Sequence, residues 1–247
     1  ATNLADALAW VPGVTSSGAA PGASRPVVRG FDANRVRTLE DGIGSFDTSD
    51  VGADHGVPLD PLAAERVEIV RGPATLRFGS QAIGGVVNAI SGRVPQALVT
   101  QSEGELVAGY GTVADSTDFS GKANVALGRV GLHADAFRRR ADDYDTPLGT
   151  IENSWIHNEG GALGGSWFLG DSPPGAPGSD RVGLGVVHYA SRYGLPGEEA
   201  YIDMDQTKLL MRSAEDALRM ISVGLSLGGA IAGRAARSQP TRRGLAV

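Results

Sequence analysis

The chain has 247 residues, with 36 glycines, no cysteine and a formal net charge of -6 at pH 7. The lack of cysteine excludes disulfides and thiolate metal sites, and the acidic balance with scattered Lys and Arg argues against a nucleic-acid partner. The longest apolar stretch, Ile221 to Gly233, is about 13 residues and too short for a membrane-spanning helix.

The first 95 residues predict a small mixed α/β unit. A short amphipathic helix is expected over Asn3 to Trp10. Short strands are expected over Pro26 to Phe31, Arg35 to Leu39, Glu65 to Arg71 and Gly84 to Ile90. Glycine, proline and small polar residues separate these segments, which is typical of loops.

The segment Val51 to Asp60 is predicted as a loop that places a carboxylate beside an imidazole, at Asp54 and His55. Both groups are good Zn²⁺ ligands, and Gly52 and Gly56 allow the backbone to bend so that both reach one ion. In the alternative interpretation, Asp54 caps the turn or holds His55 by a hydrogen bond.

After Pro95 the pattern changes to strands. Apolar and polar residues alternate over Phe119 to Leu127, Val130 to Ala136 and Val182 to Val186, with weaker segments over Glu103 to Gly111 and Trp155 to Phe168. About five such strands separated by loops fit either an outer-membrane barrel or a soluble antiparallel sheet.

The glycine-rich run Gly79-Ser-Gln-Ala-Ile-Gly-Gly85 is not a phosphate loop, because it lacks the Gly-Lys-Ser/Thr ending. The sequence also has no Gly-x-Ser-x-Gly nucleophile elbow followed by a suitable acid and histidine. We therefore expect no enzyme, no catalytic residues and no catalytic cofactor.

Four blocks occur in a characteristic order and spacing. They are Leu8-Ala-Trp-Val-Pro-Gly-Val14, Arg25-Pro-Val-Val-Arg-Gly-Phe31, Glu65-Arg-Val-Glu-Ile-Val-Arg-Gly-Pro-Ala74 and Phe78-Gly-Ser-Gln-Ala-Ile-Gly-Gly-Val-Val-Asn-Ala-Ile90. Together they resemble the plug domain of TonB-dependent outer-membrane receptors. The resemblance implies an α+β plug over residues 1–95 and the opening antiparallel strands of a transmembrane β-barrel over 96–207.

This resemblance also implies a bacterial outer-membrane location and active uptake of a substrate through contact with outer-membrane lipid and the TonB–ExbB–ExbD energy-coupling complex. Force from that complex would rearrange the plug to open a path. Paired charges where the plug meets the barrel lumen would form an ion-pair latch. The plug-motif and latch candidates are Arg29, Arg66, Glu68, Arg71, Gly72, Gly84 and Gly85.

Several short motifs resemble the subgroup that takes up zinc and related metals. They are Arg25-Pro, Arg35-Val-Arg, Asp41-Gly42, Asp54-His55 and Gly92-Arg-Val-Pro95. The resemblance implies that Asp54 and His55 form half of a metal site, completed by acidic and histidine residues of the barrel, for which Glu198, Glu199 and His157 are candidates. Copper, a metal chelate or a siderophore are the alternative substrates.

The resemblance ends near Thr207. Ala214 to Ser222 has helix-like composition, and Ala230 to Arg243 is Ala- and Arg-rich without strand alternation. We therefore expect residues 208–247 to form a divergent tail that is helical or disordered. A shifted reading frame or a premature terminus explains such a tail better than a novel domain. The start at Ala1, without a signal segment or the energy-coupling segment, also suggests truncation. A soluble periplasmic metal- or partner-binding plug module and a non-functional product remain alternatives.

Overall fold

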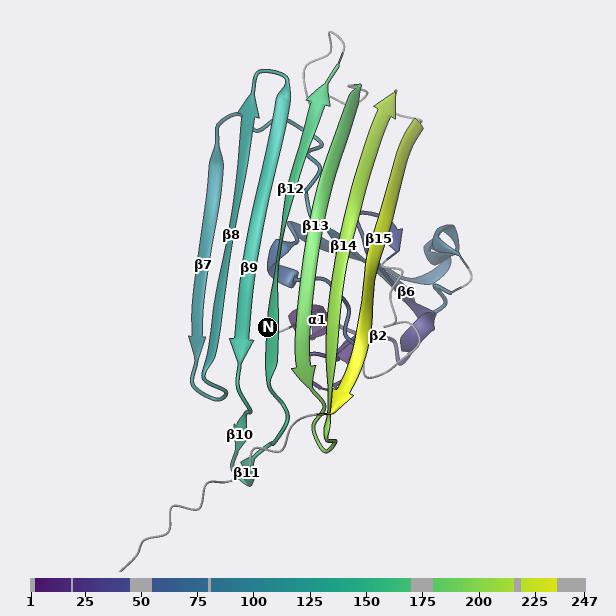
Figure 1. Ribbon diagram of the computed structural model, residues 1–247. Coiled ribbons are helices and arrows are strands. Elements are labelled where there is room, and N and C mark those ends of the chain that lie inside the picture. Colours follow the sequence, from purple (N-terminus) through teal and green to yellow (C-terminus); the bar gives the residue numbers. More distant parts are fainter. Residues whose placement is uncertain are drawn as a thin grey trace, which may run out of the picture.

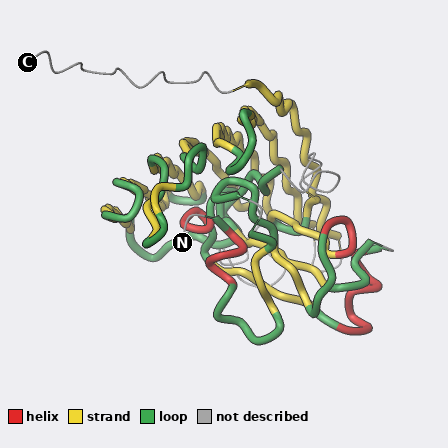
Figure 2. The backbone as a smooth tube through the Cα atoms, turned by 90° about the horizontal axis from the view of Figure 1, so that it is seen from below, coloured by secondary structure: helices red, strands yellow, loops and turns green. Residues whose placement is uncertain are grey.

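The computed structural model describes residues 3–18, 20–44, 55–79, 81–169, 180–215 and 219–234. A small mixed α/β unit occupies the chain as far as Pro95, and a sheet of long strands follows it. Viewed along its strands, the sheet forms a curved wall with the small unit on one side (Figures 1 and 2). We call these two parts the N-terminal unit and the wall.

The N-terminal unit begins with helix α1 (Leu4–Leu8), whose N-cap Asn3 accepts a hydrogen bond from the Asp6 backbone N–H. Strands β1 (Val14–Ser16) and β2 (Pro26–Val28) pair antiparallel. A four-stranded sheet has the order β4-β3-β6-β5, in which β3 and β6 are parallel. Its strands are β3 (Val36–Glu40), β4 (Ile43–Gly44), β5 (Arg66–Val70) and β6 (Gly85–Ile90).

In the described part of this unit, short 3₁₀ helices connect the strands: η1 (Ala33–Arg35), η3 (Pro61–Ala63) and η4 (Gly72–Phe78). Apolar side chains from helix α1 and the strands meet in one core, among them Leu4, Val28 and Val87. Gly84 lies against this core, where a Cβ would overlap the Phe31 side chain. Glycine is therefore required at the entry to β6.

The wall is a seven-stranded antiparallel sheet in which each strand pairs with the next long strand in the chain, and β7 and β15 are its edges. The strands are β7 (Glu103–Gly111), β8 (Ser116–Leu127), β9 (Val130–Ala141), β12 (Ile156–Phe168), β13 (Arg181–Gly194), β14 (Ala200–Glu215) and β15 (Arg219–Arg234). A hairpin of β10 (Asp145–Thr146) and β11 (Gly149–Thr150) extends beyond β9. Over the described residues the sheet does not close into a barrel.

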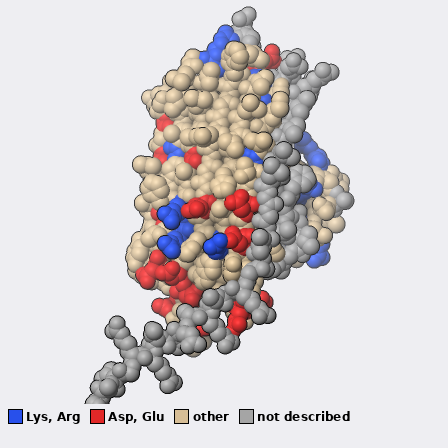
Figure 3. Space-filling model, viewed as in Figure 1, with Lys and Arg blue, Asp and Glu red and all other residues tan. Residues whose placement is uncertain are grey.

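The two faces of the wall differ because side chains alternate along each strand. The inward face is buried against the N-terminal unit, for example at Phe137 and Tyr193, which cluster with Ala23. The outward face exposes large apolar side chains such as Leu163 and Leu184. Much of this face lacks Lys, Arg, Asp and Glu, which gather toward its lower end in Figure 3.

No helix in the described part of the chain is long and apolar enough to cross a membrane.

The expectation of a helical or disordered tail from residue 208 is wrong for residues 208–215 and 219–234, which form the end of β14 and all of β15. Pairing with β13 overrides the local composition, because Lys208, Leu210 and Arg212 turn inward and are buried while Leu209 and Met211 are exposed on the outward face. The expected count of about five wall strands was therefore also too low. Residues 235–247 lie outside the described residues.

Candidate functional site: the contact between the N-terminal unit and the wall

Arg93 is the central charged group between the N-terminal unit and the wall. It lies in the segment that connects β6 to the first wall strand, and its side chain is buried. The Arg93 Nη1 lies 2.5 Å from Glu40 Oε1, while Nε and Nη2 donate to the two carboxylate oxygens of Asp135 at 2.9 and 3.0 Å. This two-pronged contact binds the end of β3 to β9 of the wall with fixed geometry.

Glu40 also contacts a second cation, which comes from the inward face of the wall. The Lys208 Nζ of β14 lies 2.9 Å from Glu40 Oε2. Burial by itself would raise the pKa of Glu40, but Lys208 and Arg93 outweigh burial and hold that pKa below its ordinary value. Glu40 is thus an ionised buried carboxylate between Arg93, which follows β6, and Lys208 of the wall strand β14.

Asp41 extends the same network to a second cation of β14, Arg212. The Arg212 Nη2 donates to the Asp41 backbone carbonyl at 2.9 Å, and it lies 3.6 Å from a carboxylate oxygen. Ser91 holds that carboxylate by donating both its backbone N–H, at 3.0 Å, and its hydroxyl, at 2.5 Å. The turn after β3 is therefore tied both to the wall and to the end of β6.

A second buried contact joins Asp60 of the N-terminal unit to β9. The Arg139 Nη1 lies 3.6 Å from Asp60, and the Arg139 Nε donates to Asp118 on β8. Both Arg139 and Asp60 are almost fully buried. Breaking such a pair leaves an uncompensated charge, so the pairs fix where the unit sits on the wall.

His133 supports Asp135 from within the wall. Its Nδ1 lies 2.6 Å from Asn124 Oδ1 and its Nε2 lies 3.0 Å from Asp135 Oδ2. Asn124 donates its own N–H to Glu103, which directs its oxygen toward the ring. His133 thus links Asn124 of β8 to Asp135 of β9 and holds the Asp135 carboxylate in place.

Glycines in the wall allow the backbone of the N-terminal unit to approach it closely. Gly164 on β12 faces Arg93, and a Cβ there would overlap the Arg93 carbonyl oxygen. On β13, Cβ atoms at Gly183 and Gly185 would press on the Val94 side chain. Val94 is itself buried with Ala162 and Val187. The inward face of β12 and β13 is therefore shaped to receive residues 93 and 94.

The ion pairs that join the N-terminal unit to the wall, as given above, do not include the residues predicted as a latch. Arg66 pairs with Glu68 at 3.0 Å within β5, and both side chains are exposed, at 69% and 45%. Arg71 donates to the Pro12 carbonyl at 2.8 Å, inside the N-terminal unit. Arg29 is exposed in the turn after β2 and has a positive φ of 52°. Gly72 begins η4, and Gly84 and Gly85 lead into β6.

Of the predicted metal ligands, Asp54 lies outside the described residues, and His55 is half-buried at the start of a described segment. The next residue, Gly56, donates its N–H to the Tyr193 hydroxyl on β13 at 2.9 Å. A Cβ at Gly56 would overlap the Gly22 carbonyl oxygen, so the segment packs backbone to backbone. The described segment that begins with His55 is thus docked on the end of β13.

The other predicted ligands divide between two places. Glu198 and Glu199 lie in the loop from β13 to β14, which begins just beyond Tyr193. That loop is held by Asn153, whose side chain donates to the carbonyls of Leu195, Glu198 and Ala200. The structure therefore brings the Glu198 loop and the His55 segment to the same end of β13.

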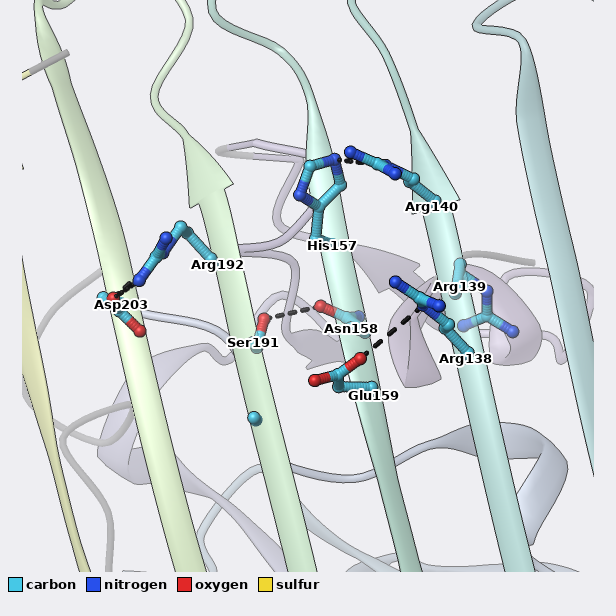
Figure 4. Close-up of a pocket in the computed structure, with 10 residues that line it drawn as sticks. Arg138, Arg139, Arg140, His157, Asn158, Glu159, Ser191, Arg192 and Asp203 are labelled. Carbon is cyan, nitrogen blue, oxygen red and sulfur yellow. Dashed lines mark hydrogen bonds and ion pairs between the residues drawn. The ribbon is translucent and has the colours of Figure 1, made fainter. Parts of the chain in front are cut away.

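His157 does not join them, because it lies on the outward face of β12 with its Nε2 3.1 Å from Arg140 Nε. Figure 4 shows it among arginines on that face. Among the described residues, no group of three or more His, Asp or Glu side chains is arranged to hold a metal ion.

Sequence reasoning missed Glu40, Arg93, Asp135 and Lys208 as contact residues. The partners of Glu40 lie 53 and 168 positions away, so no local spacing pairs them. One signal was present in the sequence. Lys208 and Asp135 lie on strands whose outward face is apolar, and a charged residue that turns to the buried face of such a strand needs a partner of opposite charge.

Comparison with known proteins gives consistent matches. Residues 1–86 match the TonB-dependent Receptor Plug Domain family. A hemin receptor of Yersinia pestis is 43% identical over 88 residues, which are 35% of this chain and 13% of that protein. The vitamin B12 transporter BtuB of Photobacterium profundum is 31% identical over 178 residues, which are 68% of this chain and 28% of that protein. The chain thus spans only a minor part of these relatives.

Solved structures share the fold at low sequence identity. The copper transporter OprC aligns over 92% of this chain and 34% of its own, with a TM-score of 0.78 and 16% identity. The FrpB iron transporter from Neisseria meningitidis aligns over 92% of this chain and 38% of its own, with a TM-score of 0.71 and 15% identity. Both the N-terminal unit and the wall strands are therefore within the shared fold.

Proposed function

We propose that this chain, which belongs to the TonB-dependent outer-membrane receptors, forms the plug and part of the barrel wall of a receptor for active uptake of a metal ion or metal chelate. One observation supports the proposal most: a plug is held against the inward face of membrane strands by buried ion pairs centred on Arg93 and Glu40. Ion pairs can be broken and remade without covalent change, as a plug that moves during transport requires.

The relatives support a substrate that contains a metal. The proteins that this chain resembles are named for hemin, vitamin B12, copper, iron and ferric enterobactin, and each of these is a metal or contains one. The exposed apolar side chains on the outward face of the wall favour a place in a membrane over a soluble plug module. The edges of β7 and β15 would pair with further wall strands, because unpaired backbone groups are costly in lipid.

Uptake by cells tests the proposed function. In a bacterium that lacks the gene for this chain, we expect lower uptake of one labelled substrate among zinc, copper, hemin, cobalamin and ferric siderophores. Removing TonB should cause the same loss, because the plug rearranges only when the energy-coupling complex engages it. Unchanged uptake of all of these substrates in the deletion strain would rule out the proposal.

We place zinc first among the substrates because Asp54 and His55 are neighbours in the sequence that offer oxygen and nitrogen ligands. The segment that begins with His55 lies at the end of β13, where the acidic loop with Glu198 and Glu199 also begins. These residues are proposed to receive the ion as cargo before the plug moves. No covalent chemistry is proposed.

Zinc titration of the protein tests this assignment. Removing a residue that hydrogen-bonds a metal ligand lowers metal affinity by roughly 10-fold or more. Removing a ligand itself should cost more, so His55→Ala and Asp54→Ala should each weaken zinc binding by more than roughly 10-fold. His188→Ala is the matched control, because His188 lies on β13 with its side chain half exposed and bonded to Thr207. Equal zinc affinity in all four proteins would remove Asp54 and His55 from the site.

A further inference from the structure

The outward face of the wall changes abruptly from apolar to charged along its strands. Leu163, Val186 and Leu209 lie side by side on neighbouring strands, and all three are exposed. Further along the same strands, toward the β10–β11 hairpin, the outward positions become Glu159, Arg192 and Asp203. Figure 3 shows Lys, Arg, Asp and Glu side chains most densely gathered in the lower half of this face. Because of strand alternation, these side chains point away from the plug.

A hollow of about 310 Å³ opens among these charged side chains. Figure 4 shows that they come from four adjacent wall strands, β9, β12, β13 and β14. The outward side chains that line it are Arg138, Arg140, His157, Glu159, Arg192 and Asp203. A hollow with cations on several sides can surround a small anionic group.

The cations of the hollow are only partly neutralised. Arg138 lies 3.6 Å from Glu159, and both side chains are more than 60% exposed. Arg192 pairs with Asp203. Such exposed pairs are weak, so a ligand anion competes with them readily. Arg140 directs its Nε to a histidine ring rather than to a carboxylate. Three guanidinium groups thus meet two carboxylates.

Aromatic rings lie beside the hollow, at the end away from Leu163, Val186 and Leu209, which we call the apolar band. The Trp155 ring lies 5.3 Å from the His157 ring and 6.4 Å from the Tyr201 ring. The Arg192 guanidinium lies 5.9 Å from the centre of the Tyr201 ring. Trp and Tyr concentrate where a membrane protein meets the headgroup layer. The hollow therefore lies at headgroup level, directly beside the band that meets acyl chains.

We propose that this hollow binds the phosphate of a membrane lipid, with the lipid's acyl chains lying on the adjacent apolar band. Guanidinium forks match phosphate oxygens in pairs, which favours phosphate over other anions. A free phosphate ion would use the arginines alone, whereas a lipid also covers Leu163 and its apolar neighbours. The site is on the opposite face of the wall from the plug, so lipid binding is independent of the transported substrate.

Lipid retention by the full chain in detergent micelles tests the proposal, with native mass spectrometry as the readout. Dioleoyl phosphatidylglycerol and lipid A supply phosphate with acyl chains, dioleoylglycerol supplies the acyl chains alone, and inorganic phosphate supplies the anion alone. Retention of the two phosphorylated lipids should exceed that of dioleoylglycerol by at least about 10-fold, as one or more charge-assisted hydrogen bonds predict. Inorganic phosphate should not displace either lipid.

The variant Arg138→Gln/Arg140→Gln/Arg192→Gln should retain phosphatidylglycerol no better than dioleoylglycerol. Arg66→Gln is the matched control, because Arg66 is as exposed as Arg138, at 69% against 70%, but lies on the plug. If the triple variant loses β-structure by circular dichroism, Arg140→Gln alone should still lower retention, because among the described residues Arg140 bonds to His157 and to no carboxylate. Wild-type retention in the folded variants would overturn the proposal, as would displacement by inorganic phosphate, which would indicate a small-anion site.

Discussion

Replacing Arg93 by methionine is expected to lower the free energy of unfolding by about 3–5 kcal/mol, the usual cost of breaking a buried ion pair by removing one partner. Arg93 is 4% exposed and contacts both Glu40 and Asp135. Methionine fills a similar volume but leaves Asp135 with His133 and Glu40 with Lys208, without the cation that joins the two carboxylates. The loss should therefore fall on the contact between plug and wall.

Chemical denaturation of the folded chain, followed by circular dichroism, measures this change. Arg66→Met is the control, because Arg66 forms an exposed ion pair with Glu68, and such pairs contribute less than about 1 kcal/mol. Equal destabilisation by the two variants would contradict the role given to Arg93. The plug should also become more sensitive to protease in Arg93→Met, since the contact that holds it to β9 is lost.

Replacing Gly164 by valine is expected to push the plug off the wall. The new Cβ would overlap the carbonyl oxygen of Arg93, which is backbone and cannot swing aside as a flexible side chain does. Overpacking of this kind costs about 1–3 kcal/mol, and a backbone clash belongs at the upper end of that range. Arg93 would move with its backbone, so its bonds to Glu40 and Asp135 should weaken as well.

Gly165→Val is the matched control, because Gly165 is the next residue of β12 but lies on the outward face. A Cβ there would come within 3.1 Å of the end of the flexible Leu132 side chain. The two variants add the same β-branched side chain to the same strand, so a difference in stability between them does not come from the β-propensity of valine. A thermal unfolding midpoint that falls equally in both would show that the inward face of β12 does not bear the plug.

Much of the fold was predictable because local sequence patterns determine where its strands and turns lie. The alternation over Phe119 to Leu127 predicted β8, and Glu103 to Gly111 matches β7 residue for residue. The glycine and proline turns of the N-terminal unit bounded β3, β5 and β6 within one or two residues. Such signals depend only on neighbours in the sequence.

The contact site was not predictable, because it depends on residues that are distant in sequence. Arg66 and Arg71 looked like latch residues because they lie in a strong motif, yet they bond within the plug. Lys208 was placed in a divergent tail, although its inward direction on β14 brings it to Glu40. The pairing register across several strands decides such contacts, and a shift of one residue in any of those strands would turn Lys208 to the other face.

A disulfide between plug and wall tests most directly whether the plug must leave the wall for uptake. The chain has no cysteine, so Val94→Cys with Gly185→Cys would add a single pair. A Val94 methyl carbon lies 3.1 Å from where a Cβ at Gly185 would stand. In cells that carry this double variant in the receptor, uptake should stop when the pair is oxidised and return on reduction, with each single variant unaffected. Uptake by the oxidised double variant at the rate of the reduced one would contradict the account.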